Sequence, residues 1–93
     1  MNDQSEDLAS LVGRLRAQKW ASRRDADRET GIPYATWQNI ELRGTIPTIA
    51  TLTLIADKLG VSEMELVSAA LVSQATRALR SSEMMASRMA SEI

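Results

Sequence analysis

Asp27-Arg-Glu-Thr-Gly-Ile-Pro-Tyr-Ala-Thr-Trp-Gln-Asn-Ile-Glu41 is the stretch of the sequence that decides the fold. It predicts two short helices joined by a glycine turn. Gly31 can take the left-handed backbone that ends a helix, and Pro33 pre-sets the backbone angle of a first helical turn. Trp37 and Ile40 lie three residues apart, which places both on one side of the second helix. The stretch therefore predicts a short helix with an apolar back, supported by the helix before it.

The other side of this second helix carries side chains suited to reading bases. The residues on or near that side are Tyr34, Ala35, Gln38 and Asn39. Asn and Gln can each pair bidentately with adenine, while Ala35 or the ring of Tyr34 could contact a thymine methyl. Recognition in the major groove by a helix-turn-helix requires this arrangement. For Gln38 and Asn39 an ordinary solvent-exposed helix surface is the alternative interpretation.

The composition predicts one small globular domain with an aliphatic core. Of the 93 residues 44% are apolar, and there is no Phe, one Tyr and two Trp. There is neither Cys nor His, so we expect no enzyme, no metal site and no cofactor. No apolar run approaches the roughly 18 residues of a membrane helix, and the acidic first residues differ from a signal peptide. We expect a cytoplasmic protein with no membrane partner and no small-molecule ligand.

The net charge of −1 conceals an asymmetry along the chain. Residues 1–13 carry three acidic groups and no basic one, whereas residues 14–43 carry seven basic and four acidic groups. Positive charge therefore gathers around the predicted reading unit, as contact with phosphates requires. A solvated helix surface explains the same asymmetry equally well.

Capping residues and glycines predict where the first three helices begin and end. The first helix should run from about residue 6 to Lys19 with Ser5 as its cap. The second should begin at Ser22 and end at Gly31. The third, the reading helix, should span residues 33–42.

The same signals predict two further helices. Ile49, Leu52, Ile55, Ala56 and Leu59 share one helical face, which predicts a fourth helix that Gly60 ends. Ser62-Glu-Met-Glu65 is a capping box that opens a fifth helix, with Met64 or Leu66 facing inward.

The tail should stay helical, because residues 61–93 contain neither Gly nor Pro. We expect a domain over residues 1–71 and a helical tail over residues 72–93. A stripe of apolar or small residues follows the tail at Val72, Ala75, Leu79, Ser82, Ala86, Met89 and Ile93. Its large members, which should form the dimer or partner contact, are Val72, Leu79, Met89 and Ile93. A dimerisation helix, a helix folded back on its own domain and a frayed tail are the three interpretations.

The chain resembles the lambda-repressor/Cro-like (XRE) helix-turn-helix family, phage repressor type, over about residues 8–70. The pieces that carry the resemblance are the Ser22 start, the Thr30-Gly31-Ile32 turn, Trp37 and Ile40 followed by Glu41, and Pro47-Thr-Ile-Ala-Thr-Leu52 leading to Leu59-Gly-Val-Ser62. The resemblance implies an all-α, five-helix lambda-repressor-like DNA-binding domain, here with an additional C-terminal helical segment.

The resemblance also implies roles for single residues. Base reading falls to Tyr34, Ala35, Gln38 and Asn39, and phosphate binding to Arg23, Arg24, Thr36, Arg43 and Lys19. For Lys19 and Arg43, as for Arg14 and Arg16 on the polar side of the first helix, a solvated position is equally expected. Trp20 and Trp37 should be structural, and Glu41 should pair with an arginine. Asp27 stands where the family usually has a small residue, so its carboxylate needs solvent or an arginine such as Arg23 or Arg24.

These features favour a sequence-specific DNA-binding transcriptional regulator, a phage or prophage repressor of the immunity or Cro type that occupies an operator in double-stranded DNA. A homodimer through the tail should bind an inverted repeat, and a monomer an asymmetric site. An antitoxin or a restriction-modification control protein would carry the same domain, with a protein partner docked on the tail of the antitoxin. From a different class comes a protein-interaction module that uses the fold without DNA.

Overall fold

The computed structural model of the protein describes residues 6–91 of the chain and the side chains of residues 6–79. These residues form five helices and no strand: α1 (Leu8–Lys19), α2 (Arg23–Thr30), α3 (Tyr34–Arg43), α4 (Ile49–Leu59) and α5 (Glu63–Ser91). The predicted all-α class and the order of five helices are confirmed for this part of the chain.

Side-chain caps set the starts of α1 and α2. The Asp7 carboxylate accepts the N–H of Ser10 at 2.9 Å, so α1 begins at Leu8 rather than near residue 6. The charge of Asp7 at the positive end of a helix makes it an effective cap, and the expected cap Ser5 lies outside the described residues. Ser22 caps α2 as predicted, because its hydroxyl accepts the N–H of Asp25 at 3.1 Å.

Glycines in the left-handed conformation end the middle helices. Gly31 (φ 78°) ends α2 and Gly60 (φ 72°) ends α4, both as predicted. α3 ends at Arg43 before Gly44 (φ 69°) and begins after Pro33, so it covers residues 34–43 instead of the predicted 33–42. The shift arises because Pro33 is the residue that caps α3, just outside its first turn.

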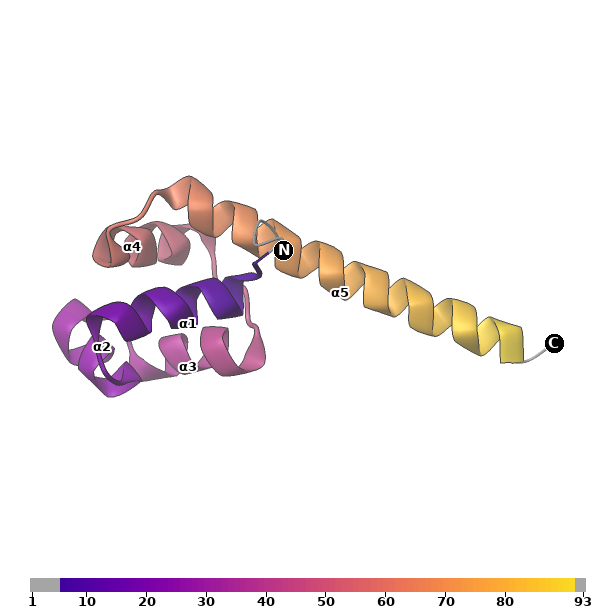
Figure 1. Cartoon of the computed structure of the whole chain (residues 1–93), viewed down its shortest axis with the longest axis horizontal. Coiled ribbons are helices and arrows are strands. Elements are labelled where there is room, and N and C mark those ends of the chain that lie inside the picture. The colour runs from indigo at the N-terminus through magenta and orange to yellow at the C-terminus, as the bar shows by residue number, and fades with distance from the viewer. Residues whose placement is uncertain (1–5, 92–93) are drawn as a thin grey trace.

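The core lies where α1 packs against α3 on one side and against α4 and α5 on the other (Figure 1). Its largest fully buried side chain is Trp37, accompanied by aliphatic residues such as Val12, Ile55 and Leu66. Trp20 is half-buried, and the centroid of its ring lies 6.0 Å from the centroid of the Trp37 ring. The predicted structural roles of the two tryptophans are confirmed.

α5 begins against the core and then leaves it (Figure 1). The N–H of Glu65 donates to the Ser62 hydroxyl at 3.2 Å, which is the serine half of the predicted capping box. Leu66 faces the core, whereas Met64 is exposed. With 29 residues α5 is about 43 Å long and sets the 56 Å length of the molecule. Within residues 6–91 no helix combines the length and apolar character that crossing a membrane requires.

Two polar contacts tie the first part of the predicted tail to the domain. The N–H of Leu8 donates to the Ser73 hydroxyl at 3.0 Å, and the Arg77 guanidinium donates to the Gly44 carbonyl at 2.7 Å. α5 runs through residues 71 and 72 without interruption, and the division into domain and tail at that point stays a prediction.

Candidate nucleic-acid interface

The inner side of α3 is buried in the core, and its outer side is exposed or half-buried. Trp37 and Ile40 are 0% and 1% exposed on the inner side. Ala35 is exposed on the outer side, and Gln38 and Asn39 are half-buried. Tyr34, the first residue of α3, is also half-buried. The four predicted base-reading residues thus lie together on α3 outside the core.

Leu42 shares the outer side of α3 with the predicted reading residues. It lies one helical turn after Gln38 and Asn39, and 61% of it is exposed. An exposed aliphatic side chain there can contact a thymine methyl or an apolar partner surface. Leu42 was not among the sequence candidates for base reading, although its helical spacing from Asn39 places it on the same side of α3.

A buried ionic junction fixes the inner side of α3 to α1 and α2. The Glu41 carboxylate, 5% exposed, accepts from Nε and Nη2 of Arg16, both at 3.0 Å. It also accepts from Nε of Arg23 at 3.0 Å. Arg16 in addition donates to the Trp20 carbonyl at 3.0 Å. The predicted ion pair of Glu41 with an arginine is confirmed, and it joins three helices.

The junction changes the interpretation of its two arginines. Arg16 is 8% exposed and so does not lie on the polar side of α1, contrary to the prediction. Its hydrogen bonds to Glu41 raise the pKa of this guanidinium above the ordinary value, although burial opposes the rise. The Arg23 side chain is 26% exposed and engaged by Glu41. A phosphate contact from Arg23 stays a prediction, and it would share the guanidinium with Glu41.

The start of α3 is held by residues of α2. The Tyr34 N–H donates to the Asp27 carboxylate at 2.9 Å. This bond satisfies an N–H at the start of α3 that Pro33 cannot cap, because the proline side chain has no hydrogen-bond acceptor. The Arg24 guanidinium lies over the Tyr34 ring, 4.7 Å from its centroid. The Asp27 carboxylate therefore bonds to a backbone N–H, whereas the sequence predicted solvent or an arginine as its partner. Because the Asp27 carboxylate accepts from the Tyr34 N–H, this N–H is not available to a phosphate.

The remaining predicted phosphate-binding residues lie at three places: the end of α1, the first turn of α3 and the end of α3. Lys19 is exposed at the end of α1, and Thr36 is half-buried in the first turn of α3. Arg43 is exposed at the end of α3, beside the loop whose Gly44 carbonyl accepts from Arg77. Arg77 was not among the sequence candidates, although its basic side chain reaches the loop after α3.

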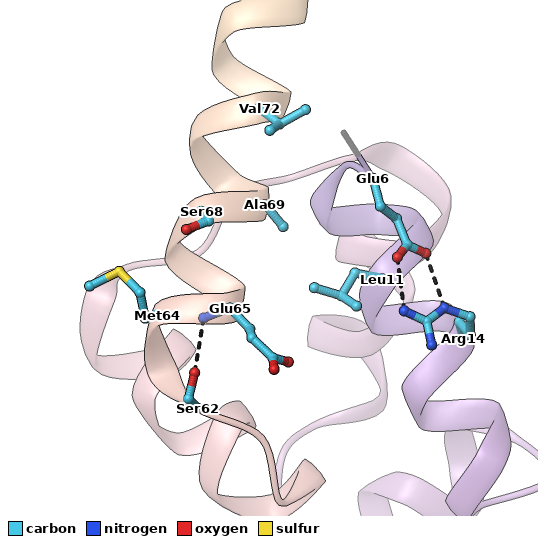
Figure 2. Close-up of a pocket in the computed structure, with 9 residues that line it drawn as sticks. All are labelled: Glu6, Leu11, Arg14, Ser62, Met64, Glu65, Ser68, Ala69 and Val72. Atoms are coloured by element: carbon cyan, nitrogen blue, oxygen red, sulfur yellow. Dashed lines mark hydrogen bonds and ion pairs between the residues drawn. The ribbon is translucent and has the colours of Figure 1, made fainter. Parts of the chain in front are cut away.

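A groove of about 460 Å³ lies between α1 and α5 (Figure 2). The Arg14 guanidinium forms two hydrogen bonds to the Glu6 carboxylate at its rim, at 2.8 and 3.2 Å. These bonds lower the pKa of the Glu6 carboxyl below its usual range. The half-buried Val72 of the predicted tail stripe lines the groove, as does Glu65. The groove lies on the α5 side of α1, whereas α3 packs on the other.

The other large members of the tail stripe lie farther along α5 or beyond it. Leu79, in the second half of α5, is 64% exposed. Met89 and Ile93, which were also assigned to a dimer or partner contact, lie outside the residues whose side chains are described. A dimer or partner contact through this stripe stays a prediction.

A second groove, of about 750 Å³, lies between α4 and α5. Ile49 and Leu71, which are 63% and 60% exposed, contribute apolar surface, and Arg43 and Arg77 contribute positive charge. Among residues 6–79, whose side chains the structure describes, no three His, Cys, Asp or Glu side chains gather in a way that could hold a metal ion. The chain matches no protein-family model, none of the curated proteins and none of the solved structures with which it was compared.

Proposed function

We propose that this protein is a sequence-specific, double-stranded-DNA-binding transcriptional regulator with a lambda-repressor/Cro-like fold, of the phage or prophage repressor type. α3 enters the major groove and reads bases with its outer side. Repression follows from occupation of the operator, with no cofactor or small-molecule ligand.

The observation that carries the proposal is the division of α3 into two sides. Its inner side is anchored by Trp37, Ile40 and the Glu41 junction, so the helix is held in a fixed position on α1 and α2. Its outer side presents Ala35, Gln38 and Asn39. Rigid presentation of amide side chains on a short helix suits bidentate pairing with adenine.

Phosphate contacts on this proposal come from both flanks of α3. Lys19 and Arg43 are exposed and can follow the DNA backbone, and the Thr36 hydroxyl can donate to a phosphate oxygen. These contacts set the position of the domain on the duplex and carry no sequence information.

Selection of duplexes from a randomised pool at near-physiological salt tests the proposal. The purified protein is expected to enrich one motif, because base contacts add to the sequence-independent attraction of phosphates. An inverted repeat would indicate two copies, joined through the exposed part of α5, and a lone motif a single copy. Failure of the folded protein to enrich any motif would contradict the proposal.

A protein-interaction module is the second candidate, and the exposed Leu42 on the outer side of α3 favours it. The net charge of −1 also weakens long-range attraction to DNA. On this hypothesis Leu42→Ala abolishes partner binding, whereas on the proposed function it alters preference at a single base pair. Comparison of wild-type and Leu42→Ala protein in the same DNA selection separates the two.

A further inference from the structure

Two neighbouring arginines at the start of α2 have different surroundings. Nε of Arg23 donates to the buried Glu41 carboxylate. Arg24 is exposed and forms no ion pair within the part of the chain that the structure describes. Its guanidinium instead lies over the ring of Tyr34, 4.7 Å from the centroid. The full charge of Arg24 is therefore available at the first residue of α3.

The seat of Arg24 is itself fixed. The Tyr34 N–H is bonded to Asp27, which ties the beginning of α3 to α2. A ring face that attracts a cation restricts where the guanidinium can lie. Within the described residues the Arg24 guanidinium forms neither an ion pair nor a side-chain hydrogen bond, so its N–H groups remain able to donate.

The geometry points to Arg24, seated on Tyr34, as a specificity-determining residue that reads a guanine. This inference rests on the proposed DNA-binding function. Guanine presents O6 and N7 as paired acceptors in the major groove, and the arginine fork matches them bidentately. The first residues of a recognition helix approach base edges, so a guanidinium held above Tyr34 is placed for a base.

The test compares the motifs selected from a randomised duplex pool by wild type, Arg24→Lys and Tyr34→Leu. Arg24→Lys keeps the charge but loses the planar fork. We expect the wild-type motif to contain a guanine whose preference over other bases falls roughly five- to hundredfold in Arg24→Lys. Tyr34→Leu removes the seat and should weaken the same preference. Arg28→Lys, at an exposed arginine of α2 to which no DNA contact is assigned, is the matched control and should leave that position unchanged.

The outcomes distinguish a guanine contact of Arg24 from a phosphate contact. Circular dichroism and tryptophan fluorescence first confirm that the variants are folded. A uniform loss on all sequences in Arg24→Lys, or an unchanged motif, would overturn the guanine assignment while leaving the proposed function intact. A uniform loss with a smaller salt dependence in Arg24→Ala would assign Arg24 to a phosphate instead. Absence of any wild-type motif would overturn both proposals.

Discussion

The two sides of α3 differ in what they contact, although they belong to the same ten residues. On the inner side Ile40 is 1% exposed and the Glu41 side chain bonds to two arginines. On the outer side Leu42 is 61% exposed and Asn39 is half-buried. Substitutions on the inner side should therefore change stability, and those on the outer side should change binding.

The largest effect is expected for Glu41→Ala. Removal of the carboxylate leaves the Arg16 charge buried without its partner, which costs about 3–5 kcal/mol of unfolding free energy. Urea unfolding followed by the fluorescence of Trp20 and Trp37 measures the loss. Glu29→Ala, at an exposed site on α2, is the control and should change stability by less than about 0.5 kcal/mol. Equal stabilities for the two variants would show that the junction is not a structural element.

Ile40→Ala and Leu42→Ala form a matched pair on opposite sides of α3. Ile40→Ala should lower the free energy of unfolding by about 2–5 kcal/mol, because truncation of this buried side chain leaves a cavity in the core. Leu42→Ala, at an exposed position, should lower the free energy of unfolding by no more than about 0.5 kcal/mol. Thermal unfolding measured by circular dichroism compares them, and a larger loss for Leu42→Ala would reverse the assignment of the two sides.

Asn39→Ala should act on binding alone. We expect the variant to lose about 1–3 kcal/mol of discrimination at one or two base pairs, since the proposed bidentate contact to adenine would disappear. Competition binding with single-base variants of the selected duplex gives the value. Lys19→Ala should instead weaken all sequences and reduce the salt dependence by about one ion. Uniform losses for both variants would remove Asn39 from the reading residues.

Asp27→Ala tests how the outer side is held at its beginning. Loss of the acceptor for the Tyr34 N–H should cost about 0.5–2 kcal/mol, the range for helix caps. Asp27→Asn keeps an oxygen acceptor and should lose less, as chemical denaturation can show. Stabilities in the reverse order would mean that the charge of Asp27 opposes the fold.

The smallest effect concerns the exposed pair Glu6 and Arg14, whose side chains are 28% and 53% exposed. Because Arg14 lowers the pKa of Glu6 in the folded protein, the pair stabilises above the usual carboxyl pKa. This contribution is lost as pH falls through the lowered value. An NMR titration should show the Glu6 pKa return toward its usual range in Arg14→Gln. An unchanged Glu6 pKa in that variant would contradict this cause.

Local signals in the sequence were sufficient for most helix ends. Ser22, Gly31 and Gly60 act on the backbone beside them, so their effect does not depend on distant residues. The buried sides of α3 and α4 were also predictable, because Trp37, Ile40 and the aliphatic residues of α4 recur at helical spacing.

Contacts between helices were harder to predict. Arg16 lies four residues after the buried Val12 and so on the same stripe of α1, but its charge suggested a solvated position. That Arg16 and Arg23 pair with Glu41, rather than another arginine, depends on how α1 and α2 cross α3. The bond from Tyr34 to Asp27 likewise depends on the angle between α2 and α3. No local pattern specifies such angles.

An NMR titration of the labelled protein with a mixed-sequence duplex at low salt tests the central claim most directly, because sequence-independent binding already reveals the surface used. We predict shifts of the side-chain amides of Gln38 and Asn39 and of the backbone amides of Ala35 and Leu42. The resonances of residues lining the groove between α1 and α5, such as Val72, should stay in place. Shifts confined to that groove, or none at all, would contradict the assignment of the outer side of α3 as the DNA-binding surface.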